Sequence, residues 1–271
     1  LLGFLSNNSS FLFKAVRCKS YEEAIVKLTK GEAEMGWLGH FSSSEAEKSG
    51  FVEPFAVGLP EGQKSPNYFS VFITKNNSKI NKLEDVKGKK IAINNIYSTS
   101  GYIIPKKELY NVEIDLDNSS EFSKILKVEN HDEAIKLLLS DEAEVATVSS
   151  VNLENFINDN SEYGDKIKII HKSQPIPGAS IVFSSLLNKN EKDIIKKLVF
   201  KAHKFVEIGG YGGKMKKYIP IAESNKKYLE AYIQPQWKWP TFASLISLIL
   251  VTIFVIIDLE INPFELFQNT Y

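Results

Sequence analysis

The sequence predicts an α/β protein made of two lobes, and three observations support this class. The chain has 271 residues, which exceeds the usual size of one domain and favours two. Short apolar runs typical of strands alternate with helical patterns, as in the βαβ units of a parallel sheet. Apolar residues make up 43% of the chain and charged residues 24%, so each lobe can bury a core.

The first lobe opens with a predicted strand, helix and strand. Residues 11–16 and 34–38 are short apolar runs that predict the strands. Between them, Ser20 begins the capping box SYEE, an apolar stripe follows, and Gly31 stands where the helix would end. The run 68–74 (YFSVFIT) is rich in β-forming residues, and the polar stretch after it predicts that the chain leaves the first lobe there.

The second lobe repeats the alternation of strands and helices. Strands are predicted at 89–94, 125–128 and 144–148, and helices from about Thr99 and over 132–139. Strands at 167–170 and 180–183 flank the segment PIPG (175–178), which predicts a return crossing. Closing helices are expected over 191–206 and in the region up to Tyr232. The predicted lobes are therefore 1–74 plus 175–236, and 75–174.

The two ends of the sequence carry further signals. Residues 239–257 are 19 in a row without a charge, which as a helix would span about 28 Å, close to a hydrocarbon core of about 30 Å. Trp237 and Trp239 lie at the entry of this run and Asp258 follows it, so it predicts a transmembrane helix; a buried core helix is the alternative. Residues 1–5 lack the features of a secretory signal, so we expect the sequence to begin inside a larger product.

Charge and composition limit the possible partners. The 33 basic and 33 acidic side chains cancel, so no nucleic-acid partner is expected. Arg17 is the sole arginine, which excludes a bidentate guanidinium contact to an anion elsewhere in the chain. Cys18 is the sole cysteine, which excludes an internal disulfide and a cysteine-based zinc site. No histidine pair has metal-ligand spacing, so neither a metal nor a cofactor is expected.

A run of hydroxyl side chains marks a candidate anion site. Ser98, Thr99 and Ser100 precede Gly101, where a predicted strand has just ended and a helix begins. Free backbone N–H groups and the positive end of the helix dipole converge at such a turn, so it can bind an anion without arginine. An ordinary serine cap is the alternative, because hydroxyl-rich caps are common.

Three further side chains stand near the ends of predicted strands. His131 opens the helix over 132–139 and could donate to an oxyanion, although a capping or surface histidine is the commoner case. His40 follows a strand at the rim where α/β folds bind ligands. Tyr68 lies in a predicted strand in which apolar and polar residues alternate. A structural role for it in the core or at the sheet edge is the alternative to a role in binding.

Five segments, taken in order, carry a family resemblance: YEEAIVKLTKGEAEMGWLGHFSSSEA (21–46), SPNYFSVFITKNNSKINKLEDVKGKKIAI (65–93), STSGYIIP (98–105), HDEAIKLLLSDEAEVATV (131–148) and KSQPIPGASIV (172–182). Together they resemble the extracytoplasmic substrate-binding proteins of phosphonate, phosphite and phosphate ABC transporters. The resemblance covers about residues 12–235. It implies a type II periplasmic-binding fold, two α/β lobes joined by crossing strands, with the oxyanion in the cleft and the family's N-terminal strand missing here.

The resemblance also implies a site and a ligand. The hydroxyls and amides of Ser98, Thr99 and Ser100, together with His131, would hold the phosphonate oxygens, and Tyr68 would close from the other lobe. Relatives that take an aminoalkyl phosphonate have carboxylates at positions matching Val151 and Ala179, and some carry an aromatic hydroxyl where Leu38 stands. Because these three side chains are uncharged and apolar here, we expect a ligand without an ammonium group: methylphosphonate, phosphite or phosphate.

By the same resemblance the protein is a binding component and not an enzyme. Its expected partners are the permease and ATPase subunits of an ABC importer, and its expected location is extracytoplasmic and membrane-anchored. Residues 258–271 resemble the start of the cognate permease, although the lysines before the predicted span oppose this topology by the positive-inside rule. A sensor ectodomain and an enzyme on the same fold are the alternatives.

Overall fold

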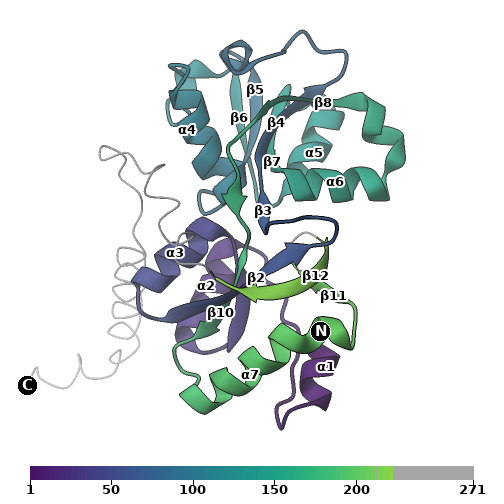
Figure 1. Cartoon of the computed structure of the whole chain (residues 1–271). Coiled ribbons are helices and arrows are strands. Elements are labelled where there is room, and N and C mark those ends of the chain that lie inside the picture. Colours follow the sequence, from purple (N-terminus) through teal and green to yellow (C-terminus); the bar gives the residue numbers. More distant parts are fainter. Residues whose placement is uncertain (211–212, 222–271) are drawn as a thin grey trace, which may run out of the picture. The chain divides into compact units, whose positions relative to one another are not determined.

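The computed structural model describes residues 1–210 and 213–221 (Figure 1). The strands form two five-stranded sheets, ordered β1-β10-β2-β12-β11 and β6-β5-β7-β4-β8, and a two-stranded pair, β3-β9. We call the first sheet with its helices the first lobe, and the second sheet with its helices the second lobe. The predicted span, 239–257, and the segment 258–271 lie outside the described residues. Within the described ranges, no helix is long and apolar enough to cross a membrane.

The first lobe has an antiparallel sheet and, among the described residues, four α-helices. The prediction of a parallel sheet from its opening strand–helix–strand pattern is wrong, because β1 pairs with β10, a strand distant in sequence. Its strands are β1 (Met35–Leu38), β2 (Val52–Pro60), β10 (Ser180–Ser184), β11 (Ile208–Gly210) and β12 (Gly213–Pro220). Its helices are α1 (Leu2–Asn7), α2 (Tyr21–Lys30), α3 (His40–Lys48) and α7 (Lys189–Lys201). In the core of this lobe, the rings of Phe55 and Phe183 stack with their centroids 4.0 Å apart. The predicted ends of α2 are confirmed, because Ser20 accepts a hydrogen bond from the Glu23 amide and Gly31 adopts φ 71°.

Two further sequence predictions in the first lobe are wrong. Residues 11–16 form no strand, because the hydroxyl of Ser6 accepts the backbone N–H of Phe13 (2.9 Å) and the hydroxyl of Ser9 accepts that of Phe11 (3.2 Å). Local side-chain bonds of this kind compete with a strand ladder. After the short 3-10 helix Ala202–Lys204, the described residues 208–210 and 213–220 form the β11–β12 hairpin where closing helices were predicted. Glycine disfavours a helix, and Gly210 leaves room for Met215 to pack closely on it. Residues 222–232 of that prediction lie outside the described residues.

The second lobe has a mixed sheet. Its strands are β4 (Ser70–Lys75), β5 (Lys90–Asn94), β6 (Lys124–Val128), β7 (Val145–Ser149) and β8 (Ile167–Lys172). Strands β6, β5 and β7 are parallel, whereas β4 runs antiparallel to β7 and β8. Helix α4 (Ile104–Tyr110) lies on one face, and α5 (His131–Leu139) and α6 (Ser150–Asp159) lie on the other (Figure 1). The carboxyl ends of the three parallel strands therefore meet at one edge.

Two short strands connect the sheets. In β3 (Asn67–Tyr68) and β9 (Ile176–Pro177), Tyr68 is opposite Ile176. The return crossing predicted around 175–178 thus coincides with β9. The chain enters the second sheet at Ser70, earlier than the predicted lobe boundary at residue 74, because β4 pairs with β7 and β8.

Candidate functional site

The turn that carries Ser98, Thr99 and Ser100, called the hydroxyl turn below, lies between β5 and α4, as the sequence predicts. Residues Thr99–Ile103 form a π-helical turn that Ser98 caps by accepting a hydrogen bond from the Gly101 amide (3.1 Å). Ser98, Thr99 and Ser100 are all at most 2% exposed. The first amides of such a turn have no partner within the helix, so the hydroxyls and the N–H groups together are chemically able to bind an anion.

Side chains from neighbouring strands hold this turn in place. Ser70, at the start of β4, donates to the Ser100 carbonyl (2.6 Å), and Thr147 of β7 donates to the Gly101 carbonyl (2.7 Å). Gly101 has no room for a side chain, because an added Cβ would lie 2.5 Å from the Asn94 side chain. The carbonyls of the turn are therefore tied to the sheet, and its amide end is left for a ligand.

His131 presents a buried donor. Its Nδ1 accepts the backbone N–H of Ser149 (3.3 Å) and lies 3.2 Å from Asn94 Nδ2. The ring proton of the neutral form must therefore be on Nε2, and Nε2 has no hydrogen-bond partner in the described part of the chain. Burial lowers the pKa of His131 to about 4, so the ring is neutral at pH 7. A buried N–H without an acceptor lowers the stability of the fold, and a ligand oxygen that accepts from it would remove this cost.

Tyr68 meets the same hydroxyls from the connecting strand β3. Burial raises the pKa of its phenol well above the usual value, while hydrogen bonds with the side chains of Ser100 and Thr99 oppose this rise. The phenol is thus protonated and lies against two of the three predicted hydroxyls. Tyr68 is 8% exposed.

Hydrogen bonds also join the first lobe directly to this turn. They are Phe41 N to Thr99 Oγ1 (2.9 Å), Ser42 Oγ to the Tyr97 carbonyl (2.9 Å) and Asn95 Nδ2 to Glu22 Oε1 (2.9 Å). His40, the remaining predicted site residue, begins α3 and lines a separate small cavity with Pro177 and Ser180. Its neighbour Phe41 donates its backbone N–H to Thr99 of the hydroxyl turn.

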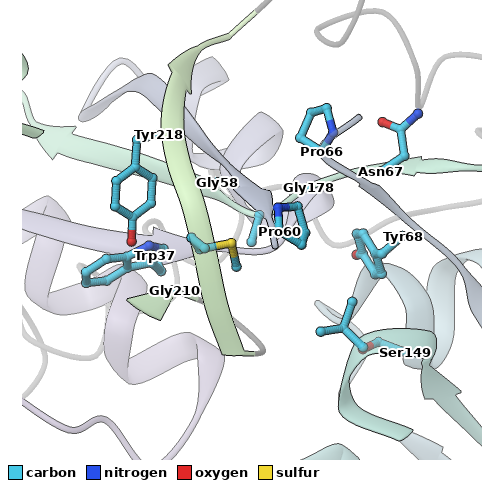
Figure 2. A pocket seen from close by; sticks show the side chains of 13 residues that line it. Trp37, Gly58, Pro60, Pro66, Asn67, Tyr68, Ser149, Gly178, Gly210 and Tyr218 are labelled. Atoms are coloured by element: carbon cyan, nitrogen blue, oxygen red, sulfur yellow. The ribbon is translucent and has the colours of Figure 1, made fainter. Parts of the chain in front are cut away.

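A cavity of about 30 Å³ lies beside Tyr68 and Ser149, with room for about two water molecules (Figure 2). Its lining includes Val151 and Ala179, which by the family resemblance stand where some relatives have carboxylates. The thirteen described residues that line it are all uncharged. Leu38 is buried at 2% exposure. An apolar group fits this lining better than an ammonium group does.

Four site residues were missed by reasoning from sequence. Ser70, Asn94, Thr147 and Ser149 are small polar residues buried to 1% exposure or less in otherwise apolar strands. A buried polar residue within an apolar strand, next to a predicted ligand turn, is the signal that could have found them.

Two α/β lobes joined by crossing strands, with a buried set of uncharged donors at the strand ends, define a periplasmic-binding-protein-like fold. Over residues 1–233 the chain matches the family described as ABC transporter, phosphonate, periplasmic substrate-binding protein. The chain belongs to this family, so the family prediction from sequence is confirmed.

Individual relatives agree with this membership. The chain is 28% identical over 179 residues to the phosphonates-binding periplasmic protein of Escherichia coli (strain K12). The aligned region covers 65% of this chain and 52% of the relative. The chain therefore spans about half the length of that curated relative.

Solved structures support the fold. A binding protein component of an ABC phosphonate transporter from Pseudomonas aeruginosa aligns with a TM-score of 0.73 and 20% identity, covering 94% of this chain and 88% of that one. PhnD1 from Prochlorococcus marinus, in complex with methylphosphonate, aligns with a TM-score of 0.70 and 16% identity, covering 85% and 88%. At these identities the similarity shows the fold alone.

Proposed function

We propose that this chain is the extracytoplasmic solute-binding component of an ABC importer and binds a phosphorus oxyanion at the hydroxyl turn. The observation that carries the proposal is the buried Nε2–H of His131, which has no hydrogen-bond partner among the described residues and lies in a set of uncharged donors. The bound oxygens would accept from this N–H, from the hydroxyls of Ser98, Thr99 and Ser100, and from Tyr68.

The available hydrogen bonds are sufficient for tight binding. About five charge-assisted bonds at roughly 1.5–3 kcal/mol each give about 8–15 kcal/mol gross. An association cost of at least about 4 kcal/mol still leaves room for micromolar or tighter affinity. Thr99 accepts from Phe41 of the first lobe, so a ligand that contacts Thr99 would couple its binding to contact between the lobes.

The ligand that fits carries no ammonium group. None of the proposed donors is a cation at pH 7, because burial lowers the pKa of His131 to about 4. Val151 and Ala179 line the neighbouring cavity and offer no carboxylate to an amine. Methylphosphonate, phosphite and phosphate are therefore the proposed ligands, and methylphosphonate is the ligand of the similarly folded PhnD1.

The wider assembly belongs to the same proposal. The permease and ATPase subunits would be the partners, residues 239–257 would anchor the chain in the membrane, and residues 258–271 would begin a permease-like region. The proposed lobes are 1–74 plus 175–236, and 75–174, with the change that the first crossing ends at Ser70, where β4 begins.

Thermal unfolding of the full chain in a mild detergent tests the binding role. Methylphosphonate, phosphite, phosphate, aminoethylphosphonate and sulfate would each be added at about 1 mM, since a ligand at 100 times its Kd stabilises by about 2.7 kcal/mol. We expect an upward shift of Tm with a phosphorus oxyanion and none with sulfate. Ser98→Ala should abolish the shift, whereas Ser140→Ala, at an exposed serine outside the site, should keep it. No shift with any phosphorus oxyanion would reject the proposal.

A further inference from the structure

Asn94 contacts both halves of the proposed site. It is the last residue of β5 and is 1% exposed. Its side chain packs under the hydroxyl turn, where an added Cβ on Gly101 would lie 2.5 Å away. Its Nδ2 is also 3.2 Å from Nδ1 of His131. Asn94 thus touches the turn and the histidine, the two elements that would donate to the anion.

The hydrogen bonds around Asn94 determine its orientation. Nδ2 donates to the Thr147 carbonyl at 3.0 Å. The flipped amide would place Oδ1 against that carbonyl, oxygen to oxygen, so the observed orientation is the favourable one. The second hydrogen of Nδ2 is then available to His131 Nδ1.

Two donors consequently converge on one ring nitrogen. The backbone N–H of Ser149 (3.3 Å) can only donate, and Asn94 Nδ2 donates from a second direction. A proton on Nδ1 would oppose both. A flipped imidazole ring would present a carbon to them and leave two buried donors without an acceptor.

We propose that Asn94 is a positioning residue that holds His131 as the neutral Nε2–H tautomer and supports the hydroxyl turn beside it. This inference rests on the proposed function of the site. A histidine with a proton on Nδ1 alone would present a lone pair to the ligand oxygen, so the fraction of molecules in the Nε2–H form scales the apparent affinity.

Nitrogen NMR of the full chain with ¹⁵N-labelled histidine tests this directly, without ligand. His131→Gln assigns the His131 signals by their loss. We expect wild-type His131 to show one tautomer, protonated on Nε2. Asn94→Leu removes the donor at similar size, and we expect mixed tautomers and at least fivefold weaker methylphosphonate binding by calorimetry.

Thr74→Val is the matched control. Thr74 is a buried residue of the same sheet whose hydroxyl donates to the Glu144 carbonyl (2.8 Å). Loss of this hydroxyl should leave the His131 tautomer unchanged and change the affinity for methylphosphonate by no more than twofold. A pure Nε2–H tautomer in Asn94→Leu, with affinity within twofold of wild type, would overturn the inference.

A second variant covers the case in which Asn94→Leu does not fold. Asn94→Asp places an acceptor opposite Nδ1 of His131, so we expect Nδ1 to gain a proton in this variant. An unchanged His131 tautomer in Asn94→Asp would refute the inference. A proton on Nδ1 of His131 in the wild-type protein would refute it as well. The proposed function has a different rejecting result, namely that the wild-type protein binds none of the phosphorus oxyanions. The ligand-free spectra remain decisive for Asn94 in that case.

Discussion

Two substitutions of His131 separate its two ring nitrogens. In His131→Asn, the side-chain oxygen can take the place of Nδ1 and accept from Ser149, but the donor at the Nε2 position is lost. In His131→Gln, the longer side chain can place an N–H near Nε2, while the acceptor at Nδ1 is lost. If Nε2–H binds the ligand, the asparagine variant must bind more weakly than the glutamine variant.

The expected magnitude follows from the burial of Nε2. A hydrogen bond to a charged group is worth about 1.5–3 kcal/mol, which is about 10- to 150-fold in affinity at about 1.4 kcal/mol per tenfold. Because Nε2 is already buried and has no partner in the described structure, it has little hydration to lose on binding, so we expect the upper part of this range for His131→Asn.

Isothermal titration calorimetry of methylphosphonate at pH 7 is the assay, with urea unfolding of each variant to confirm that the chain is folded. We expect wild type to bind most tightly, His131→Gln less tightly and His131→Asn at least tenfold more weakly than wild type. Equal affinity of His131→Asn and wild type would refute the assignment of Nε2 as a ligand donor, and so would tighter binding by His131→Asn than by His131→Gln.

Three further predictions concern pH, specificity and lobe contact. The pKa of His131 is lowered to about 4 in the folded chain, so the unfolded chain binds an extra proton between about pH 4 and 6.5; stability should fall by up to about 3 kcal/mol as pH drops through this window. Urea unfolding at pH 7 and 4.5 should show a smaller loss in His131→Gln; an equal loss would place its cause elsewhere. Ala179→Asp introduces a carboxylate into the cavity lining, so the affinity ratio of aminoethylphosphonate to methylphosphonate should rise at least tenfold by calorimetry. Ala179→Asn is the uncharged control, and a similar rise there would exclude the charge as its cause. Ser42→Ala removes the hydrogen bond to the Tyr97 carbonyl and should weaken methylphosphonate binding about two- to tenfold without contacting the ligand. Unchanged affinity would show that this bond does not contribute to the binding-competent state.

Reasoning from sequence succeeded where the signal is local. The capping box at Ser20, the Gly31 terminus and the strand-to-helix spacing around Ser98 each depend on residues a few positions apart. The same spacing placed His131 at the start of a helix that follows a strand. The family resemblance rests on these local patterns in a fixed order.

Local reasoning failed where a competing contact decided the outcome. Residues 11–16 have the apolar pattern of a strand, but Ser6 and Ser9 take the backbone N–H groups of Phe13 and Phe11. The region after α7 contains a hairpin, in which β12 pairs with β2, a strand distant in sequence. Neither contact is visible in a short window of sequence.

The sequence by itself determined the fold class, the family, and the chemistry of the proposed site: uncharged donors at the start of a helix, with no arginine to replace them. Only the tertiary structure decided how those donors are oriented. The tautomer of His131 depends on Asn94 and Ser149, which lie 37 and 18 residues away from it in the chain. The hydrogen bond between the side chains of Tyr68 and Ser100 forms because the connecting strand β3 places Tyr68 beside the hydroxyl turn. Hydrogen-bond direction is set by which groups become neighbours on folding, and that information is not carried by residue spacing.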